Sequence, residues 1–245
     1  MEGKGLTGYC FEILSKELPL QRVSGLDDIE NVKLLSGQDG GGIKIYQGEK
    51  IDKVTLVDLN FGDGIPVPHH DNALSVGSEI FQILPDLTYK MPIWGINSIV
   101  MKDGTYYFDT DFTFGFDLVM EYDFTMNYLA SFNEVYNKFW NHKDFKRVYL
   151  DETTTWVRTY ISPVFIMVTT RVETVATVYE LCAELIKCWL TMYKDAEQRD
   201  EAFKQSQLTR IKAQYAGMQQ TDRMGKVIMK AYGQETFSKF FKAML

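Results

Sequence analysis

The pattern of hydrophobic and polar positions is clearest in Leu87–Phe112, where two apolar runs flank the turn Lys102–Gly104. Asp-Gly between runs rich in Ile, Val, Tyr and Phe is a strong β-hairpin signal. Because side chains alternate along a strand, Asn97 falls among apolar neighbours on one face of the first run. Asp109 and Asp111 share one parity on the second run. A buried amide needs partners and a half-buried carboxylate shifts its pKa, so we expect any active surface on this sheet.

The rest of the pattern predicts strands between helices. Apolar residues predict helices over Leu6–Leu18, Met126–Phe145 and Glu173–Asp195. A helix that is polar on most sides is predicted over Arg199–Gln219, and two more over Arg223–Tyr232 and Glu235–Leu245, with Gly233 as the stop between them. Further strands are predicted near Val32–Leu35, Ile43–Tyr46, Val54–Phe61, Glu79–Leu84 and Trp156–Val168, with a long loop over Gly62–Ser78. No βαβ alternation is present. The expected fold class is therefore α/β, a three-layer α/β/α sandwich around an antiparallel sheet, with residues 1–245 as a single domain.

Composition and charge narrow the possible partners. With 245 residues and 45% hydrophobic content, the chain can bury a sizeable core. The net charge of -7 argues against a general nucleic-acid-binding protein. Residues 203–245, however, carry eight Lys and Arg residues against two acids. Such a basic end suits an anionic ligand or an acidic protein partner, and a solvated helix face is the alternative.

The cysteines and the hydrophobic runs indicate which cellular compartment the protein occupies. Cys10, Cys182 and Cys188 have no CxxC spacing, which argues against an iron–sulfur cluster or a four-ligand zinc site and favours free thiols. No secretory signal is visible, and no run reaches the roughly 18 apolar residues of a membrane span. We expect a soluble monomer in the cytoplasm, or in the plastid stroma if a transit peptide has been removed.

Two local motifs resemble ligand sites but are better explained as a turn and a surface loop. The glycine-rich run at residues 36–42 lacks the Lys-Ser/Thr of a phosphate loop and is followed by a predicted strand, so it is interpreted as a turn. His69, His70 and Asp71 lack the spacing of known metal motifs. We interpret them as a surface loop and expect no bound metal.

Three segments together resemble the ferredoxin-dependent bilin reductases. The run LPDLTYKMPIWGIN at residues 84–97 resembles a strand of that family. Tyr160–Pro163 is similar to its Y/F-x-SP segment, and residues 221–225 followed by Tyr232–Glu235 resemble its C-terminal motif. The three segments follow the family's order across residues 80–245. Red chlorophyll catabolite reductase is a relative with the same general layout, and a closer relation to it is an alternative.

The resemblance implies a fold and an activity. Members of the family have an α/β/α sandwich and bind an open-chain tetrapyrrole between the sheet and the C-terminal helices. They reduce biliverdin or a dihydrobiliverdin to a phytobilin with single electrons from external reduced ferredoxin, and they hold no cofactor of their own. Each electron must be matched by a proton, for which carboxyl groups with a raised pKa are suitable donors.

The resemblance assigns site residues by position. The family's helix aspartate falls on Asp222, the expected proton donor, and the following Arg223 is suited to a bilin propionate. The strand carboxylate of the family falls on Asn97, which is a departure because an amide cannot deliver a proton at neutral pH. The histidine of phycocyanobilin-forming members falls on Ile80, which argues against a reaction through that histidine.

Further residues complete the expected site. Asp109 and Asp111 are additional candidate proton donors, and Ile80 and Trp94 are expected to contact the substrate. Arg158 and Arg171 are further propionate candidates. Because plant-type ferredoxins are acidic, a basic surface that includes Lys226, Lys230, Lys239 and Lys242 is expected to steer them to the site.

Asn97 leaves three hypotheses open. In the first, Asp222 with Asp109 or Asp111 supplies the protons, and the regiochemistry differs from that of better-known members. In the second, the chain binds a bilin without reducing it, as a carrier or chaperone. In the third, the chain is an ordinary interaction domain and the resemblance is fortuitous.

Overall fold

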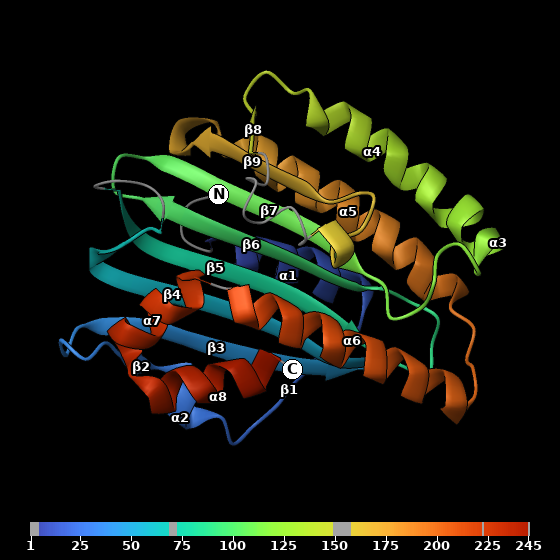
Figure 1. Cartoon of the computed structure of the whole chain (residues 1–245), viewed down its shortest axis with the longest axis horizontal. Coiled ribbons are helices and arrows are strands. Elements are labelled where there is room, and N and C mark those ends of the chain that lie inside the picture. Colours follow the sequence, from blue (N-terminus) through green and yellow to red (C-terminus); the bar gives the residue numbers. More distant parts are fainter. Residues whose placement is uncertain (1–4, 69–72, 149–157, 222, 245) are drawn as a thin grey trace.

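The computed structural model describes residues 5–68, 73–148, 158–221 and 223–244. In these residues, nine strands form one antiparallel sheet in the order β1-β3-β4-β5-β6-β7-β9-β8, with β2 paired to β3. Figure 1 shows α1 and α5 behind this sheet and α6, α7 and α8 in front of it. The predicted three-layer α/β/α sandwich is confirmed.

The elements have the following bounds. The strands are β1 (Gln21–Arg22), β2 (Val32–Lys33), β3 (Asp39–Gly48), β4 (Ile51–Pro66), β5 (Leu74–Pro85), β6 (Ile93–Met101), β7 (Thr105–Thr113), β8 (Lys146–Arg147) and β9 (Ile166–Arg171). The longer helices are α1 (Gly5–Glu17), α4 (Ala130–Trp140), α5 (Ala176–Asp195), α6 (Glu201–Thr221), α7 (Arg223–Tyr232) and α8 (Gln234–Met244). Short helical segments are α2 (Asp27–Glu30), α3 (Tyr122–Phe124), η1 (Thr125–Leu129) and η3 (Val172–Thr174).

The predicted central hairpin is present as β6 and β7. Its turn is fixed by Asp103, which accepts a hydrogen bond from the Thr105 N–H at 2.8 Å. Gly104 adopts a φ of 82°, which a side chain would disfavour. The strand begins at Ile93, later than the apolar run suggested, because Leu87 instead packs with Ile93 against Ile211 of α6. The hairpin register, once set by this turn, decides which polar side chains meet.

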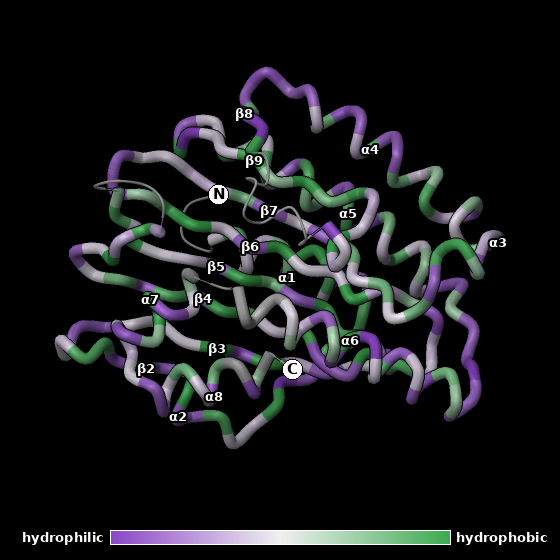
Figure 2. The backbone as a smooth tube through the Cα atoms, viewed as in Figure 1, coloured by the Kyte–Doolittle hydropathy of each residue, from purple (hydrophilic) through white to green (hydrophobic). Residues whose placement is uncertain are grey.

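The two faces of the sheet are covered differently. Side chains such as Phe81, Trp94 and Phe108 enter a large core with α1, α4 and α5. The opposite face packs against α7 and α8 around Val57 and Leu59. Figure 2 shows hydrophobic stretches along the central strands, with hydrophilic ones at several turns and on α4. Strand alternation therefore sorts an apolar core face from a face with polar side chains.

One sequence expectation was wrong. The long loop expected over residues 62–78 is largely strand, because β4 continues to Pro66 and β5 begins at Leu74. The pairing shifts register between Asn60 and Ile65, and Gly62 and Gly64 take positive φ values there. The glycines that suggested a loop thus serve a bulge inside a long hairpin.

Other boundaries differ less. The extended run predicted from Trp156 is strand from Ile166 onward, after the turn at Ser162 and Pro163. The helix predicted from Met126 starts with a π-helical turn and ends at Trp140. None of the described helices combines the length and the hydrophobicity needed to span a bilayer.

Candidate active site

Asn97 and Asp109 form a polar pair in the middle of the sheet. They are direct partners in the β6–β7 register, and Asn97 has the parity of Ile93, which packs against Ile211 of α6. The Asn97 Nδ2 donates to the Asp109 Oδ2 at 3.0 Å. From β5, the hydroxyl of Ser78 donates to the Asn97 Oδ1 at 3.4 Å. Ile80 lies beside Asn97 in the same sheet, as its β5 partner.

Asp109 carries an unusual carboxyl group. Burial raises its pKa to about 7, the nearby Asp111 adds to the rise, and the Asn97 hydrogen bond opposes it. The carboxyl group is therefore divided between its acid and carboxylate forms near neutral pH. That is the range in which a general acid is most effective.

Asp111 lies two residues further along the same face but is held differently. Its carboxylate accepts the N–H of Ser162 at 3.0 Å and the N–H of Phe112 at 2.8 Å, and it also accepts the Ser162 hydroxyl. Burial raises the pKa of Asp111, while these three donors favour its charged form. We therefore interpret Asp111 as an anchor that fastens the Ser162–Pro163 segment to β7.

The helix α6 and the segment before β9 approach the same face. The Gln82 Nε2 of β5 donates to the Tyr215 hydroxyl of α6 at 2.6 Å. Tyr160 lies so close to α6 that a Cβ atom on Gly217 would stand 2.6 Å from its hydroxyl oxygen. Polar groups from β5, α6 and the Tyr160–Ser162 segment thus lie on the same side of the sheet as Asn97 and Asp109.

The structure brings only some of the sequence-predicted residues together. Asn97, Asp109, Asp111 and Ile80 share one face. Trp94 lies on the other: it is fully buried in the core and donates from Nε1 to the Thr110 hydroxyl. The expected substrate contact by Trp94 does not fit this position, because strand alternation turns its side chain away from Asn97.

The predicted arginines and the C-terminal motif are not seen in contact with Asn97 or Asp109 in the described residues. Arg171 is exposed near the β6–β7 turn, where it donates to the carbonyl of Asp103 at 2.7 Å. Arg158 lies exposed in a short helical turn. Asp222 lies outside the described residues. Arg223 begins α7, and its side chain also lies outside the description.

Three residues were not identified from the sequence. Ser78 and Gln82 have the parity of Ile80 on β5, which strand alternation would have revealed once the strand was known to start at Leu74. Tyr215 depends on how α6 lies across the sheet, for which the sequence carried no signal.

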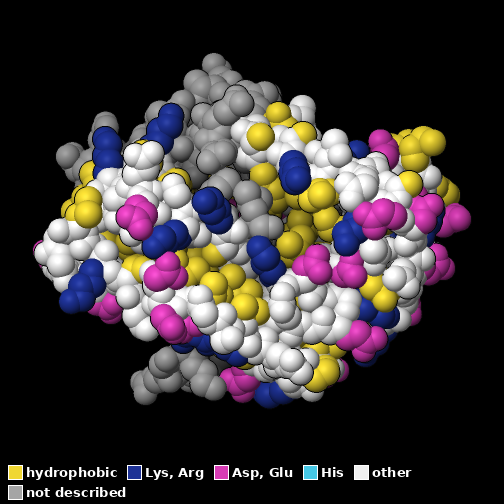
Figure 3. Space-filling view, turned by 90° about the horizontal axis from the view of Figure 1, so that it is seen from below, with side chains coloured by type: hydrophobic (Ala, Val, Ile, Leu, Met, Phe, Trp, Pro, Cys, Tyr) yellow, Lys and Arg dark blue, Asp and Glu magenta, His cyan; other side chains and the backbone are white. Residues whose placement is uncertain are grey.

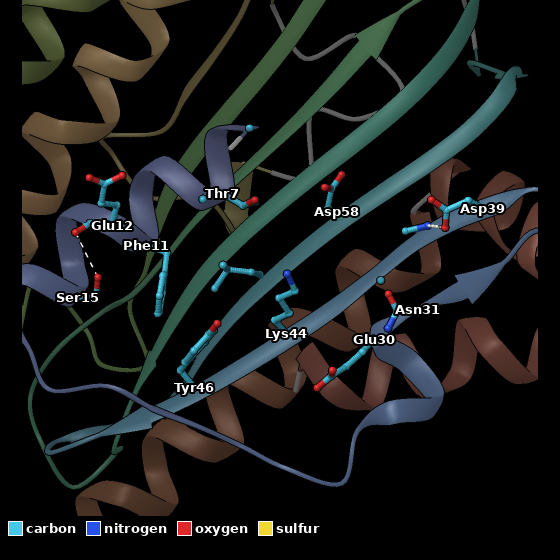
Figure 4. Close-up of a pocket in the computed structure, with 15 residues that line it drawn as sticks. Thr7, Phe11, Glu12, Ser15, Glu30, Asn31, Asp39, Lys44, Tyr46 and Asp58 are labelled. Atoms are coloured by element: carbon cyan, nitrogen blue, oxygen red, sulfur yellow. Dashed lines mark hydrogen bonds between the residues drawn. The ribbon is translucent and has the colours of Figure 1, made fainter. Parts of the chain in front are cut away.

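A hollow lies on the opposite face of the sheet. It has a volume of about 660 Å³ and is lined by α1, α2, β3 and β4, with Lys44 between Tyr46 and Asp58 (Figure 4). Asp58 is the β4 partner of Glu79, which caps the α1 N-terminus by accepting the Thr7 N–H. This hollow is separated by the sheet from Asn97 and Asp109.

The described residues hold no cluster of three or more His, Cys, Asp or Glu side chains suited to a metal ion. Cys10, Cys182 and Cys188 are free thiols, and the first two are buried. His69, His70 and Asp71 lie outside the described residues. The polar groups described around Asn97 and Asp109 are carboxyl groups, amides and hydroxyls.

Comparison with known proteins addresses the fold. No family model and no curated protein sequence matches the chain. Among solved structures, phytochromobilin synthase from tomato, in complex with biliverdin, matches with a TM-score of 0.74. The match covers 96% of this chain and 79% of that chain, at 12% sequence identity. The chain has the fold of a bilin reductase. The resemblance drawn from the three sequence segments is thus supported at the level of the fold.

Proposed function

We propose that this protein is a bilin oxidoreductase. It binds an open-chain tetrapyrrole such as biliverdin over the β5–β7 face, beneath the C-terminal helices, and reduces it to a phytobilin. Single electrons come from external reduced ferredoxin, and no bound metal or flavin takes part. The observation that carries the proposal is Asp109, a buried carboxyl group with a pKa of about 7 in the fold of a protein solved with biliverdin.

Asp109 supplies protons in this proposal. When one electron enters the conjugated tetrapyrrole, the Asp109 carboxyl O–H bond breaks and its proton moves to the tetrapyrrole radical, leaving a carboxylate. Solvent returns a proton before the second electron arrives, so each step adds one electron and one proton. An apolar slot stabilises a radical anion poorly, which is why coupling the two transfers lowers the barrier.

The remaining predicted residues have supporting roles. Asp222, which the resemblance assigns as an acid, is the candidate for a second proton donor. Arg223 and Arg158 are candidates for pairing with the propionates, because a guanidinium group forms paired hydrogen bonds with a carboxylate.

The first experiment tests binding and then turnover. The purified chain is mixed with biliverdin, and the visible spectrum is recorded for a shifted complex. Reduced ferredoxin is then added, and product is separated by chromatography. A parallel sample with a chlorophyll-derived open-chain tetrapyrrole tests the alternative closer to red chlorophyll catabolite reductase. Absence of any complex with either pigment would contradict the proposal and favour an interaction domain.

Asp109→Asn tests the proposed acid. Loss of a general acid typically costs 10²- to 10⁴-fold in rate, and we expect a loss of about that size with the biliverdin complex retained. The matched control is Asp123→Asn, which replaces an exposed carboxyl group in α3. Unchanged turnover in Asp109→Asn would remove Asp109 from the mechanism and leave Asp222 as the donor to test.

A second candidate function is a bilin carrier that does not reduce its ligand. It is favoured by Asn97, an amide at the position where the resemblance expects an acid. A stable biliverdin complex that yields no product with reduced ferredoxin, at any pH between about 5 and 8, would support the carrier.

A further inference from the structure

A hydrogen-bonded row of three side chains crosses β5, β6 and β7. Ser78 donates to the Asn97 Oδ1 at 3.4 Å, and the Asn97 Nδ2 donates to the Asp109 Oδ2 at 3.0 Å. Ser78 is buried, with 4% of its surface exposed. In this row the amide oxygen faces the serine hydroxyl and the amide nitrogen faces the carboxyl group.

We infer that Asn97 is a positioning residue that decides which oxygen of Asp109 carries the transferable proton. The carbonyl oxygen of a neutral carboxylic acid accepts hydrogen bonds better than its hydroxyl oxygen, so the Asn97 N–H at Oδ2 favours the proton on Oδ1. Among the hydrogen bonds of the described residues, none involves Oδ1. The inference rests on the proposed function for the use of that proton, but not for its location.

The neighbours of Asp109 leave this role to Asn97. On β7 the titratable groups with the parity of Asp109 are Tyr107 and Asp111, and Asp111 is already bound by Ser162 and Phe112. On β9 the partner of Asp109 is Met167. From β5, Ile80 and Gln82 lie on the same face, and Gln82 is bound to the titratable Tyr215 of α6. In the described part of the chain, Asn97 is the side chain that donates to Asp109.

The consequence is chemical as well as geometric. When Asp109 gives up its proton, the carboxylate that forms keeps the N–H of Asn97, and a hydrogen bond to a charged group is stronger than one to a neutral group. Asn97 thereby favours proton release and holds the oxygen in place for reprotonation. An amide at this position thus assists an acid on the neighbouring strand.

The test measures the titration of Asp109 directly. The side-chain carboxyl carbon of Asp109 is followed by NMR in ¹³C-labelled protein without any pigment, in wild type and in Asn97→Leu. Leucine has a similar size and no donor. We expect the midpoint to rise by about one pH unit or more, the effect of losing a hydrogen bond to a carboxylate. Ser78→Ala, which frees the amide to turn, should give a smaller rise in the same direction.

The opposite amide orientation makes the opposite forecast. If the Asn97 oxygen faced Asp109, it would accept the proton of the neutral acid, and Asn97→Leu would lower the midpoint. A lowered or unchanged midpoint in both variants would therefore overturn the inference. The control is Ser98→Ala, which removes a buried hydroxyl from the other face of β6 and should leave the midpoint unchanged. If Asn97→Leu fails to fold, Ser78→Ala decides the sign.

Turnover adds an arm that separates this inference from the proposed function. With biliverdin and reduced ferredoxin, the pH profile of Asn97→Leu should shift upward by the same amount as its carboxyl titration. A shifted titration without any turnover in wild type would sustain the positioning role and contradict the reductase. Turnover whose pH profile ignores the titration would contradict the role of Asn97 in proton transfer.

Discussion

Asp109 and Asp111 show how one strand face can hold two carboxyl groups with different tasks. Asp111 accepts three donors, two of them from Ser162, and is satisfied as an anion. Asp109 accepts one amide N–H, and burial dominates its pKa. Pairs of carboxyl groups in contrasting surroundings are a common way to separate an acid from an anchoring anion. The proposed chemistry follows from that contrast.

The raised pKa of Asp109 has a consequence for stability. An aspartate has a pKa of about 3.9 when unfolded, so the folded state favours the neutral form up to a pH of about 7. The stability that this neutral form contributes is full below the unfolded pKa and is lost as pH rises through 7. The Asn side chain of Asp109→Asn stays neutral. The free energy of unfolding of this variant, relative to that of wild type, should therefore increase by roughly 2–3 kcal/mol between about pH 5 and pH 8.

Urea unfolding of both proteins across this pH range measures the difference. Asp123→Asn, at an exposed carboxyl group, should show no comparable trend. A constant gap between wild type and Asp109→Asn would mean that Asp109 titrates normally in the folded state.

The sequence reached part of this site at the residue scale. The Asp-Gly turn fixed the hairpin, and parity placed Asp109 and Asp111 together, which the structure bears out. Whether Asn97 faces them depends on the register across the hairpin, which a turn type decides only approximately. Partners from distant segments, such as Tyr215 and Ser162, come from helix docking and loop packing that no local pattern encodes.

At the scale of elements, the Ser162–Pro163 segment is fastened to β7 through Asp111. Ser162→Ala removes the hydroxyl that donates to Asp111 and accepts the Val164 N–H at 3.1 Å. Because hydrogen bonds to charged groups contribute about 1.5–3 kcal/mol, we expect a loss of that order in stability. Hydrogen exchange should quicken in residues 160–165, and biliverdin should bind more weakly.

A matched control for this variant is Thr209→Ala, which removes an exposed hydroxyl that donates to the carbonyl of Gln205. Its stability and exchange should stay close to wild type. If Ser162→Ala left exchange in residues 160–165 unchanged, the anchoring role of Asp111 would have to be abandoned.

The docking of α7 onto the sheet depends on Tyr232. Its buried hydroxyl lies 2.6 Å from the carbonyl oxygen of Gly40 and 3.1 Å from that of Asn60. Tyr232→Phe leaves these acceptors without the donor, at a cost of about 1–3 kcal/mol. Thermal or urea unfolding should show this loss, whereas Tyr122→Phe, at a residue 64% exposed, should not. Equal stability of the two variants would mean that water satisfies both carbonyls.

At the scale of the whole molecule, the sheet separates two unlike sides. The side of α1 and α5 holds the larger apolar core and the polar hollow beside α1, while the other side combines the α7–α8 cluster with the polar site. Grouping of strands between helices was enough to predict these layers. It was not enough to predict the long β4–β5 hairpin, because bulge glycines and loop glycines look alike in a single sequence.

The distribution of charge over the molecular surface indicates where the electron donor is expected to bind. Figure 3, looking at the molecule from below, shows Lys and Arg side chains interspersed with Asp and Glu, with hydrophobic side chains visible between them. Lys239 is engaged, since its Nζ lies 2.9 Å from Asp28 and 3.2 Å from Glu235. Lys226 and Lys230 of α7 are exposed, and no ion pair is found for them among the described residues. The surface expected to meet ferredoxin therefore centres on α7.

Reversing one charge on this surface, with Lys226→Glu, tests it. An acidic ferredoxin associates faster with a surface of positive charge. Removing such charges changes association rates by 10-fold or more at low salt. We expect kcat/KM for reduced ferredoxin to fall by about 10-fold at low ionic strength, with biliverdin affinity unchanged. The loss of kcat/KM should be smaller at about 0.5 M salt, where screening limits electrostatic attraction to a few ångströms. Lys187→Glu, on α5 behind the sheet, is the matched control, and an equal loss there would show that net charge alone governs the encounter.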